Sequence, residues 1–252
     1  MLVMQSTRMP RALWKGYISF GLVMIPVSLH SADLGTSDLH LDMLDSRNGA
    51  KVKYLRVNEK TGKEVPWESI VKGHKVDGRY VVLTPDDFKA AASKVARGIQ
   101  ITDFVPRDSV SPFYYEKPYY LSPAKGGERV YALLRETLKR TDRVGIANVV
   151  IQARPRLGAL MVHDDVLAVV TLRFGDELRS VEEIDAPRTG AAGVKLNASE
   201  LEMAEKLVEG MSSDFNPAKY HDDYRESLNA VIETRASGKS VGPIADEEPE
   251  VP

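Results

Sequence analysis

The chain contains no cysteine among its 252 residues. This absence excludes disulfide bonds, thiolate catalysis, thiolate-bound zinc and iron–sulfur clusters, and it fits a reducing cytoplasm. Long hydrophobic runs are also missing, because no apolar stretch reaches the roughly 20 residues that cross a bilayer. The opening residues 1–16 lack the unbroken apolar segment of a signal peptide. We therefore expect a cytoplasmic protein that has no membrane partner.

The chain has little net charge, but its charges are segregated. The formal net charge is −2, with 28% charged and 43% hydrophobic residues, which is typical of a soluble globular protein with one large domain. All charged residues before Asp33 are basic, and residues 47–79 are rich in lysine and arginine. All charged residues within 246–250 are acidic. Because the position of charge matters more than its sum, the composition is compatible with DNA binding.

Signatures of enzymes are scarce. The chain has neither G-x-x-x-x-G-K-[ST] nor G-x-G-x-x-G, so it lacks the standard phosphate-cradling loops. Ser69–Lys72 matches the S-x-x-K motif of penicillin-binding enzymes and Lys60–Gly62 matches K-T-G. Their order is reversed relative to those enzymes and no S-D-N lies between them. We therefore predict that the chain has no catalytic residues.

Histidines and aromatic residues give two weaker hints. Histidines stand near carboxylates at His40 with Asp42, at His163–Asp165 and at His221–Asp223. His40 and Asp42 would share one face of a strand, as metal ligands could. The segment 163–165 indicates a turn, and the segment 221–223 indicates the acidic first turn of a helix. We expect neither a metal site nor a cofactor. Aromatic residues within 113–120 could stack on bases, but tyrosines in a β-prone, proline-flanked segment favour packing.

Short β-prone segments dominate the first two thirds of the chain. Residues 16–32 predict one buried strand that bends at Gly21, and turns are expected at 47–49 and 60–63. A strand over 79–83 is expected to run into a helix that is capped by Thr84 with Asp87. Further strands are predicted over 101–106, 119–123 and 143–154. Residues 157–174 predict two more strands, which are joined by a turn at Asp164.

Helical periodicity appears in the middle and again near the end of the chain. Residues 128–142 predict an amphipathic helix, with one apolar face formed by Val130, Leu133, Leu134 and Leu138. Beyond about residue 185, a helix over 199–211 is expected to begin with a capping box of Ser199 and Glu202. Its apolar side would carry Leu201, Ala204, Leu207, Val208 and Met211. A second helix follows over 221–236.

The order of several short motifs resembles the bacterial Ku family, whose members bind DNA ends in non-homologous end joining. The resemblance covers nearly everything from residue 10 to 240. Its most specific parts are the opening segment Arg11–Val27 and the later segment Asp214–Arg225. Further matches are Tyr80–Thr84 with Asp86 and Asp87, Tyr119–Leu121, Thr141–Val144, Arg156–Leu160 and Asp176–Arg179.

The resemblance implies a mostly β fold with helices. It implies a Ku-type β-barrel core over 10–184, preceded by a flexible N-terminus over 1–9. A bridge inserted over about 36–105 would encircle DNA, and a helical arm over 185–240 would wrap the dimer. The tail over 241–252 should be disordered and acidic, since its charges are all of one sign.

The same resemblance implies a non-enzymatic function, namely sequence-independent binding of double-stranded DNA ends by a homodimeric ring. The implied partners are DNA ends, a second copy of the chain and the ATP-dependent multifunctional DNA ligase of end joining, in a nucleoid-associated setting in the cytoplasm. The alternatives are a DNA-end-processing enzyme and a generic DNA-binding scaffold.

Basic residues on the expected hairpins and later strands are the candidate phosphate contacts, because lysine and arginine gain affinity for DNA by releasing counterions. They are Arg47, Lys51, Lys53, Arg56, Lys60, Lys63, Lys72, Arg154 and Arg156.

Two features depart from the family pattern. Some relatives carry a pair of cysteines where this chain has Val57–Gly62, so a metal or redox role there is lost. Many relatives end in a lysine-rich extension, whereas this chain ends in an acidic one.

Overall fold

The computed structural model describes residues 11–35, 39–92, 98–151, 154–187, 193 and 195–238. The chain divides into two compact units. The barrel unit comprises Met1–Gly35 and Asp42–Val181, and the arm unit comprises Thr36–Leu41 and Glu182–Pro252. The expected flexible N-terminus (1–9) and acidic tail (241–252) lie outside the described residues.

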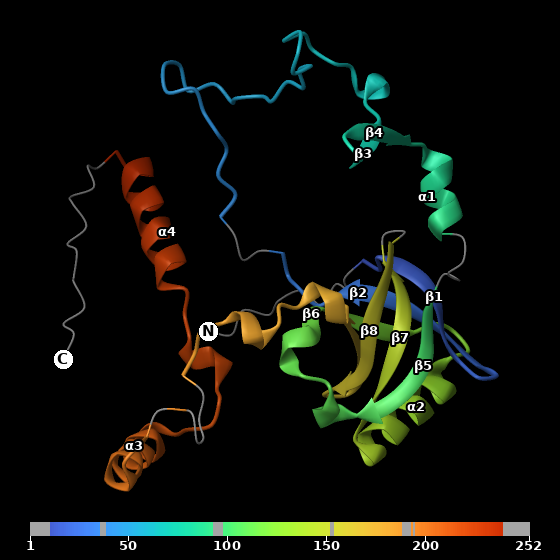
Figure 1. The fold of residues 1–252 in the computed structure, drawn as a ribbon, viewed down its shortest axis with the longest axis vertical. Coiled ribbons are helices and arrows are strands. Elements are labelled where there is room, and N and C mark those ends of the chain that lie inside the picture. Colours follow the sequence, from blue (N-terminus) through green and yellow to red (C-terminus); the bar gives the residue numbers. More distant parts are fainter. Residues whose placement is uncertain are drawn as a thin grey trace. The chain divides into compact units, whose positions relative to one another are not determined.

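The barrel unit is built on a closed seven-stranded barrel, with the strand order β1-β2-β6-β9-β8-β7-β5 (Figure 1). This barrel confirms the predicted mostly β fold with helices. The seven strands are β1 Trp14–Phe20, β2 Val23–Ser31, β5 Ile99–Pro106, β6 Tyr115–Pro123, β7 Arg143–Ile151, β8 Arg154–His163 and β9 Val166–Leu172.

The prediction of one bent strand over residues 16–32 is wrong. Strands β1 and β2 form an antiparallel hairpin in which Ile18 lies opposite Ile25, and the chain reverses at Gly21, whose φ is +53°. Burial alternates over the first five residues of β1 and at the start of β2, so Ile18 and Ile25 are fully buried while Tyr17 and Met24 are exposed. The apolar run reflects two half-buried strands joined by a glycine turn. It does not reflect one strand buried on both faces.

The barrel closes through a short parallel seam between β1 and β5. Only two residue pairs form this seam, Ile18 with Ile99 and Ser19 with Gln100, whereas the other neighbouring strands pair antiparallel. Residues 32–98 therefore form an insertion between the barrel strands β2 and β5. Residues 99–105, which the expected bridge included, belong to the barrel because they lie in β5. Likewise, the strand predicted over 143–154 ends at Ile151, and Arg154 begins β8.

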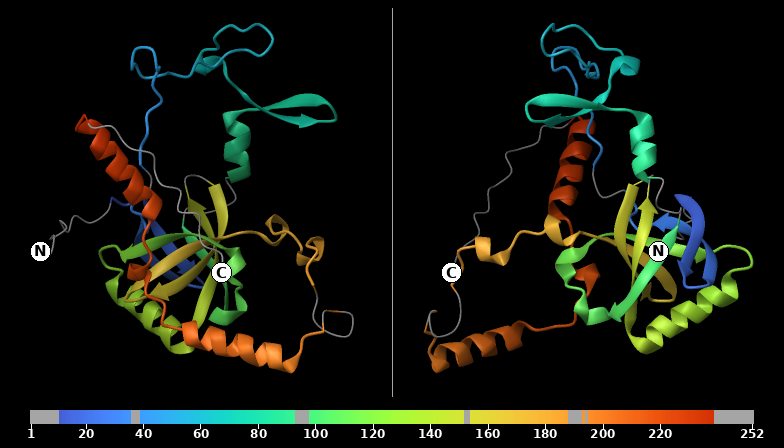
Figure 2. Two further views of the ribbon diagram at one scale, coloured as in Figure 1. Left: turned by 90° about the vertical axis from the view of Figure 1, so that its left-hand side faces the viewer. Right: turned by 45° about the vertical axis from the view of Figure 1, so that its right-hand side comes forward.

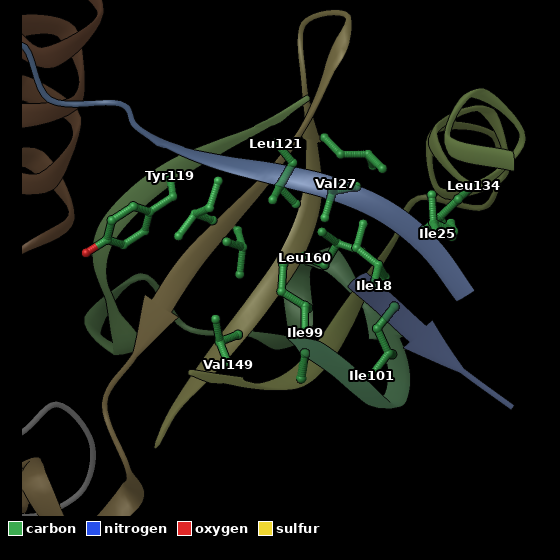
Figure 3. Close-up of a cluster of buried hydrophobic side chains, with 14 of the residues drawn as sticks. Ile18, Ile25, Val27, Ile99, Ile101, Tyr119, Leu121, Leu134, Val149 and Leu160 are labelled. Carbon is green, nitrogen blue, oxygen red and sulfur yellow. The ribbon is translucent and has the colours of Figure 1, made fainter. Parts of the chain in front are cut away.

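Aliphatic side chains fill the barrel (Figure 3), with Ile18, Ile25, Val27, Ile99 and Val149 among those that are fully buried. These residues come from strands distant in the sequence, so closing the barrel creates one continuous core.

Helix α2 (Glu128–Thr141) contributes Tyr131, Leu134 and Leu138 to this core. The predicted apolar face is therefore partly wrong. Val130 and Leu133 are exposed, because the buried side of α2 is centred on Tyr131, which the prediction left out.

The hydroxyl of Tyr131 links α2 to the barrel. It donates to the carbonyl oxygen of Leu121 and accepts from the backbone N–H of Leu167, both at 2.7 Å. Burial raises the pKa of Tyr131 above its ordinary value. The stabilisation associated with this raised pKa is present in full below pH 10 or so, and it is lost as the pH rises through the raised value.

We expect Tyr131→Phe to lower the free energy of unfolding by about 1–3 kcal/mol, because the buried N–H of Leu167 would lose its acceptor. Denaturant unfolding followed by circular dichroism measures this change. Tyr120→Phe is the matched control, since that hydroxyl forms no hydrogen bond with any described residue. Equal losses in the two variants would contradict the assigned role of Tyr131.

The described part of the insertion has little regular structure and no core of its own. Its two predicted turns are present, each flanked by an isolated antiparallel bridge, Leu44 with Lys51 and Val57 with Glu64. A hairpin of β3 (Lys72–Val76) and β4 (Arg79–Leu83) then leads into helix α1 (Pro85–Ala92), as Figure 2 shows. Among residues 39–91, which the structure describes, no side chain is buried.

The predicted cap of α1 is confirmed. The Thr84 backbone N–H donates to the Asp87 carboxylate at 2.7 Å, and the Asp87 N–H donates to the Thr84 hydroxyl at 3.3 Å. The Thr84 hydroxyl also donates to the Asp87 carboxylate at 2.7 Å, and this hydrogen bond, together with that of the Thr84 backbone N–H, lowers the pKa of Asp87.

The arm unit contains helices α3 (Ala198–Met211) and α4 (Asp223–Ala236). The capping box of α3 is formed by Asn197 and Glu200, so the prediction of Ser199 and Glu202 was two residues late. Both pairs have the required spacing, and asparagine caps as well as serine. No described residue of this unit is buried, and the apolar side of α3 is exposed.

Candidate nucleic-acid interface

The nine predicted phosphate contacts are all exposed, and they fall into two sets. Seven lie on the insertion between residues 47 and 72, and two lie at the start of β8. Their local partners differ, and this difference separates the candidates.

Two of the insertion cations are ion-paired with nearby carboxylates. The Arg47 guanidinium contacts the Asp45 carboxylate at 2.7 Å and donates a second hydrogen bond to it at 2.9 Å. This interaction lowers the pKa of Asp45. The Lys51 ammonium lies 2.6 Å from the Asp42 carboxylate. Such surface pairs contribute little stability, but each one partly neutralises the charge that a phosphate would meet.

Two other insertion cations lie over aromatic rings. The Arg56 guanidinium is 4.6 Å from the centre of the Trp67 ring, and the Lys72 ammonium is 5.3 Å from the centre of the Phe88 ring. Stacking on a ring restrains the side chain and leaves its charge in place. Arg56 and Lys72 therefore remain able to contact phosphates.

Lys53, Lys60 and Lys63 carry the least compensated charges of the insertion. Within the described part of the chain, their ammonium groups have no ion pair or hydrogen bond. Asn58 fixes the turn that presents two of them, because its side-chain oxygen accepts from the N–H of Lys60 at 3.0 Å and its carbonyl oxygen accepts from Gly62 at 2.8 Å. These three lysines are the strongest candidates for phosphate contact.

Arg154 and Arg156 lie on the barrel, beside a cavity that is also lined by Glu116 and Lys117. Arg156 approaches the Glu116 carboxylate at 3.8 Å.

The sequence prediction missed Lys117, because no basic cluster surrounds it. It also left out Lys75 and Arg79, which are exposed on the β3–β4 hairpin and lie within the lysine-rich segment.

The enzyme-like motifs do not form a site. Lys72 of the S-x-x-K fragment lies over Phe88, and its partner Ser69 ends a short 3-10 helix. In the ranges that the structure describes, no group of three or more histidine, aspartate or glutamate side chains could hold a metal ion. Nor does any helix among the described residues have the length and apolar character needed to span a membrane.

The aromatic segment 113–120 divides between packing and exposure. Tyr119 is buried in the core, as the packing interpretation predicted, but Phe113 is 76% exposed. His163 precedes the predicted turn at Asp164 and stacks on Tyr120, with ring centres 5.9 Å apart.

Fold and surface together define a class: a closed β-barrel protein that carries an exposed cationic insertion between two barrel strands. Residues 19–203 match the family model described as the Ku70/Ku80 beta-barrel domain. The chain belongs to the Ku family.

Curated relatives extend this match over most of the chain. The chain is 42% identical to "Non-homologous end joining protein Ku" of Coxiella burnetii, over 92% of this chain and 85% of that protein. It is 46% identical to the protein of the same name from Cupriavidus necator, over 95% of this chain and 72% of the relative. The Pseudomonas aeruginosa protein of that name is 43% identical, over 95% and 82% respectively.

Proposed function

We propose that the protein binds double-stranded DNA ends in non-homologous end joining, without sequence preference and without catalysing a reaction itself. The observation that carries this proposal is the exposed, coreless, lysine-rich insertion in a barrel of the Ku family. Relatives covering most of the chain are named for end joining, which supports the same role.

The chemistry of the insertion suits the DNA backbone. A protein that grips a break must accept any sequence, so it contacts phosphates and duplex shape in place of base edges. The lysines at 53, 60 and 63 can release condensed counterions when they meet phosphates, which makes binding strongly dependent on salt. Arg47, Lys51, Arg56 and Lys72 add charge around them.

The binding form is a homodimeric ring. The described part of the arm unit buries none of its apolar residues within one chain, so Leu207, Val208 and Met211 are available to a second copy. Two-fold pairing is the commonest way in which two identical chains close such a surface.

We therefore expect the mass of a dimer, about twice 27.9 kDa, in light scattering at micromolar concentration. Replacing Leu207 and Met211 together by serine should shift the mass towards the monomer, whereas serine at the exposed position Leu133 on α2 should not. A monomeric wild-type protein would contradict the ring.

The proposed partner beyond DNA is the ATP-dependent multifunctional DNA ligase of end joining, which the bound ring recruits in the cytoplasm at the nucleoid. No cofactor is required for this role. The purified protein should leave labelled DNA ends unchanged with or without Mg²⁺ and ATP, and it should stimulate joining when the ligase is added. Turnover by the protein alone would favour an end-processing enzyme.

Deleting residues 241–252 should preserve or modestly strengthen DNA binding. The segment carries Asp246, Glu247, Glu248 and Glu250 and no basic residue, so it competes with phosphates for the cations of the insertion. Fluorescence anisotropy with labelled duplex measures the effect, and replacing the four carboxylates by amides separates charge from length. A large loss of affinity would show that the tail assists binding.

A further inference from the structure

One end of the barrel contains a polar cavity of about 420 Å³. We call it the mouth cavity, and its polar lining comprises Glu116, Lys117, Tyr119, Arg154, Arg156 and Thr171. These residues lie near the starts of β6 and β8 and near the end of β9. Because neighbouring strands are antiparallel, those segments meet at the same end of the barrel.

The strand register places two arginines on the inner side of the barrel wall. Arg154 lies opposite Ile151 and Arg156 lies opposite Val149. Directly opposed residues of an antiparallel pair project to the same face, and both Ile151 and Val149 belong to the core. The side chains of Arg154 and Arg156 therefore project to the inner face of the barrel. They lie at its end, beyond the last aliphatic residues of the core.

Positive charge exceeds negative charge around the cavity. Glu116 is shared between Arg156 at 3.8 Å and Arg173 at 3.7 Å. Both distances exceed hydrogen-bonding length, so the Arg156 guanidinium keeps its donors unused by Glu116. Lys117 has a loose ion pair with Asp33 at 3.3 Å. No described residue forms an ion pair with Arg154.

Tyr119 supplies a donor from the cavity wall. Its side chain is only 7% exposed, and its hydroxyl forms no hydrogen bond with any residue that the structure describes. Figure 3 shows this hydroxyl pointing away from the aliphatic cluster, and Tyr119 lines the mouth cavity. Among the described residues, the only fully enclosed side-chain polar atom without a partner is Trp14 Nε1, so the Tyr119 hydroxyl is open to the mouth cavity and can donate to a ligand there.

We propose that the mouth cavity binds a phosphate group through Arg154, Arg156 and the hydroxyl of Tyr119. A guanidinium presents paired N–H donors that match two oxygens of a phosphate, and the phenol donates to a third. The phosphate belongs either to DNA or to a free phosphate compound. The DNA source rests on the proposed function, whereas the phosphate chemistry of the cavity does not.

Titration calorimetry of the full-length protein with inorganic phosphate, at constant ionic strength, tests the cavity. Wild type is expected to bind one phosphate per chain. Arg154→Gln with Arg156→Gln should weaken binding at least about tenfold, and Tyr119→Phe about threefold or more, since each change removes charge-assisted donors. The controls Tyr120→Phe, on the neighbouring residue, and Arg140→Gln, on the exposed end of α2, should bind as wild type does.

Thermal unfolding of each variant without phosphate shows whether it is folded, and Tyr119→Phe keeps the test informative if the double variant is unstable. Phosphate binding that is absent in wild type, or unchanged in the folded variants, overturns the proposal.

A second arm uses linear duplex DNA and identifies the source of the phosphate. Weaker DNA binding by the double variant, together with competition by inorganic phosphate, assigns the site to DNA. Unchanged DNA binding with lost phosphate binding assigns it to a free phosphate compound. If wild type binds phosphate but no DNA, the proposed end-binding function fails while the phosphate site stands.

Discussion

A covalently closed circle is expected to compete for the protein on the order of a hundredfold less effectively, per base pair, than linear duplex of the same sequence. The proposed ring can load only over an end, so a circle would offer it only weak outer-surface contacts with phosphates. Competition in a gel shift with a labelled linear fragment measures the ratio. The result should hold for any sequence, because phosphate contacts carry no base information.

Blocking the ends of a loaded fragment gives the matching control. Bulky groups attached to both ends after binding should trap the protein against excess competitor, whereas the same groups attached beforehand should prevent loading. Cutting the trapped fragment with a restriction enzyme should release the protein. If circular and linear DNA compete equally, threading is excluded and the protein is a generic DNA-binding scaffold.

Reversing the three uncompensated lysines of the insertion should weaken DNA binding more than reversing three other exposed cations of the chain. We expect Lys53→Glu, Lys60→Glu and Lys63→Glu together to weaken end binding on the order of a hundredfold near physiological salt. The dependence of log affinity on log salt should become shallower by about 5, because a homodimer loses six phosphate-contacting cations. The fold should be preserved because the three side chains are exposed on a segment with no core. Anisotropy titrations at several salt concentrations, with unfolding curves for each variant, measure both effects.

A matched triple variant controls for the change in net charge. Lys125 lies in the segment before α2, and Lys139 and Arg140 lie in its last turn. All three are exposed, and reversing them alters the formal charge by the same amount. Only a small loss is expected there. A second comparison reverses Arg47, Lys51 and Arg56, which already have partners, and a smaller loss is expected than for the three lysines. Equal losses in all three variants would show that overall charge, and not the lysines of the insertion, determines affinity.

The sequence predicts best those features that depend on neighbouring residues. The cap formed by Thr84 and Asp87 and the two turns of the insertion are examples. Each involves only residues within about four positions of one another, so local chemistry determines it. The hairpin of β1 and β2 was missed for the opposite reason. Whether Ile18 and Ile25 belong to one strand or two depends on whether Gly21 bends or reverses the chain, and pairing with β5 and β6 decides that.

The candidate site shows the same division. Basic residues could be named from composition, but their partners could not. Asp42 reaches Lys51 and Trp67 reaches Arg56 across turns of the insertion, so these pairs require its three-dimensional course. The mouth cavity depends further on strand register, because only the pairing of Ile151 with Arg154 shows on which side of the wall that arginine lies. The closed barrel itself was predicted through resemblance to a family, and not from periodicity.

The parallel seam of the barrel has a consequence for how the protein folds and how its length can vary. Joining Ile18 to Ile99 closes a loop that contains the whole insertion, and only two residue pairs hold it. The entropic penalty of closing such a loop grows with the logarithm of its length, so doubling the insertion would cost only about 0.6 kcal/mol. The seam should therefore form late, after the antiparallel strands have paired, and the span of the insertion can lengthen or shorten with little effect on barrel stability.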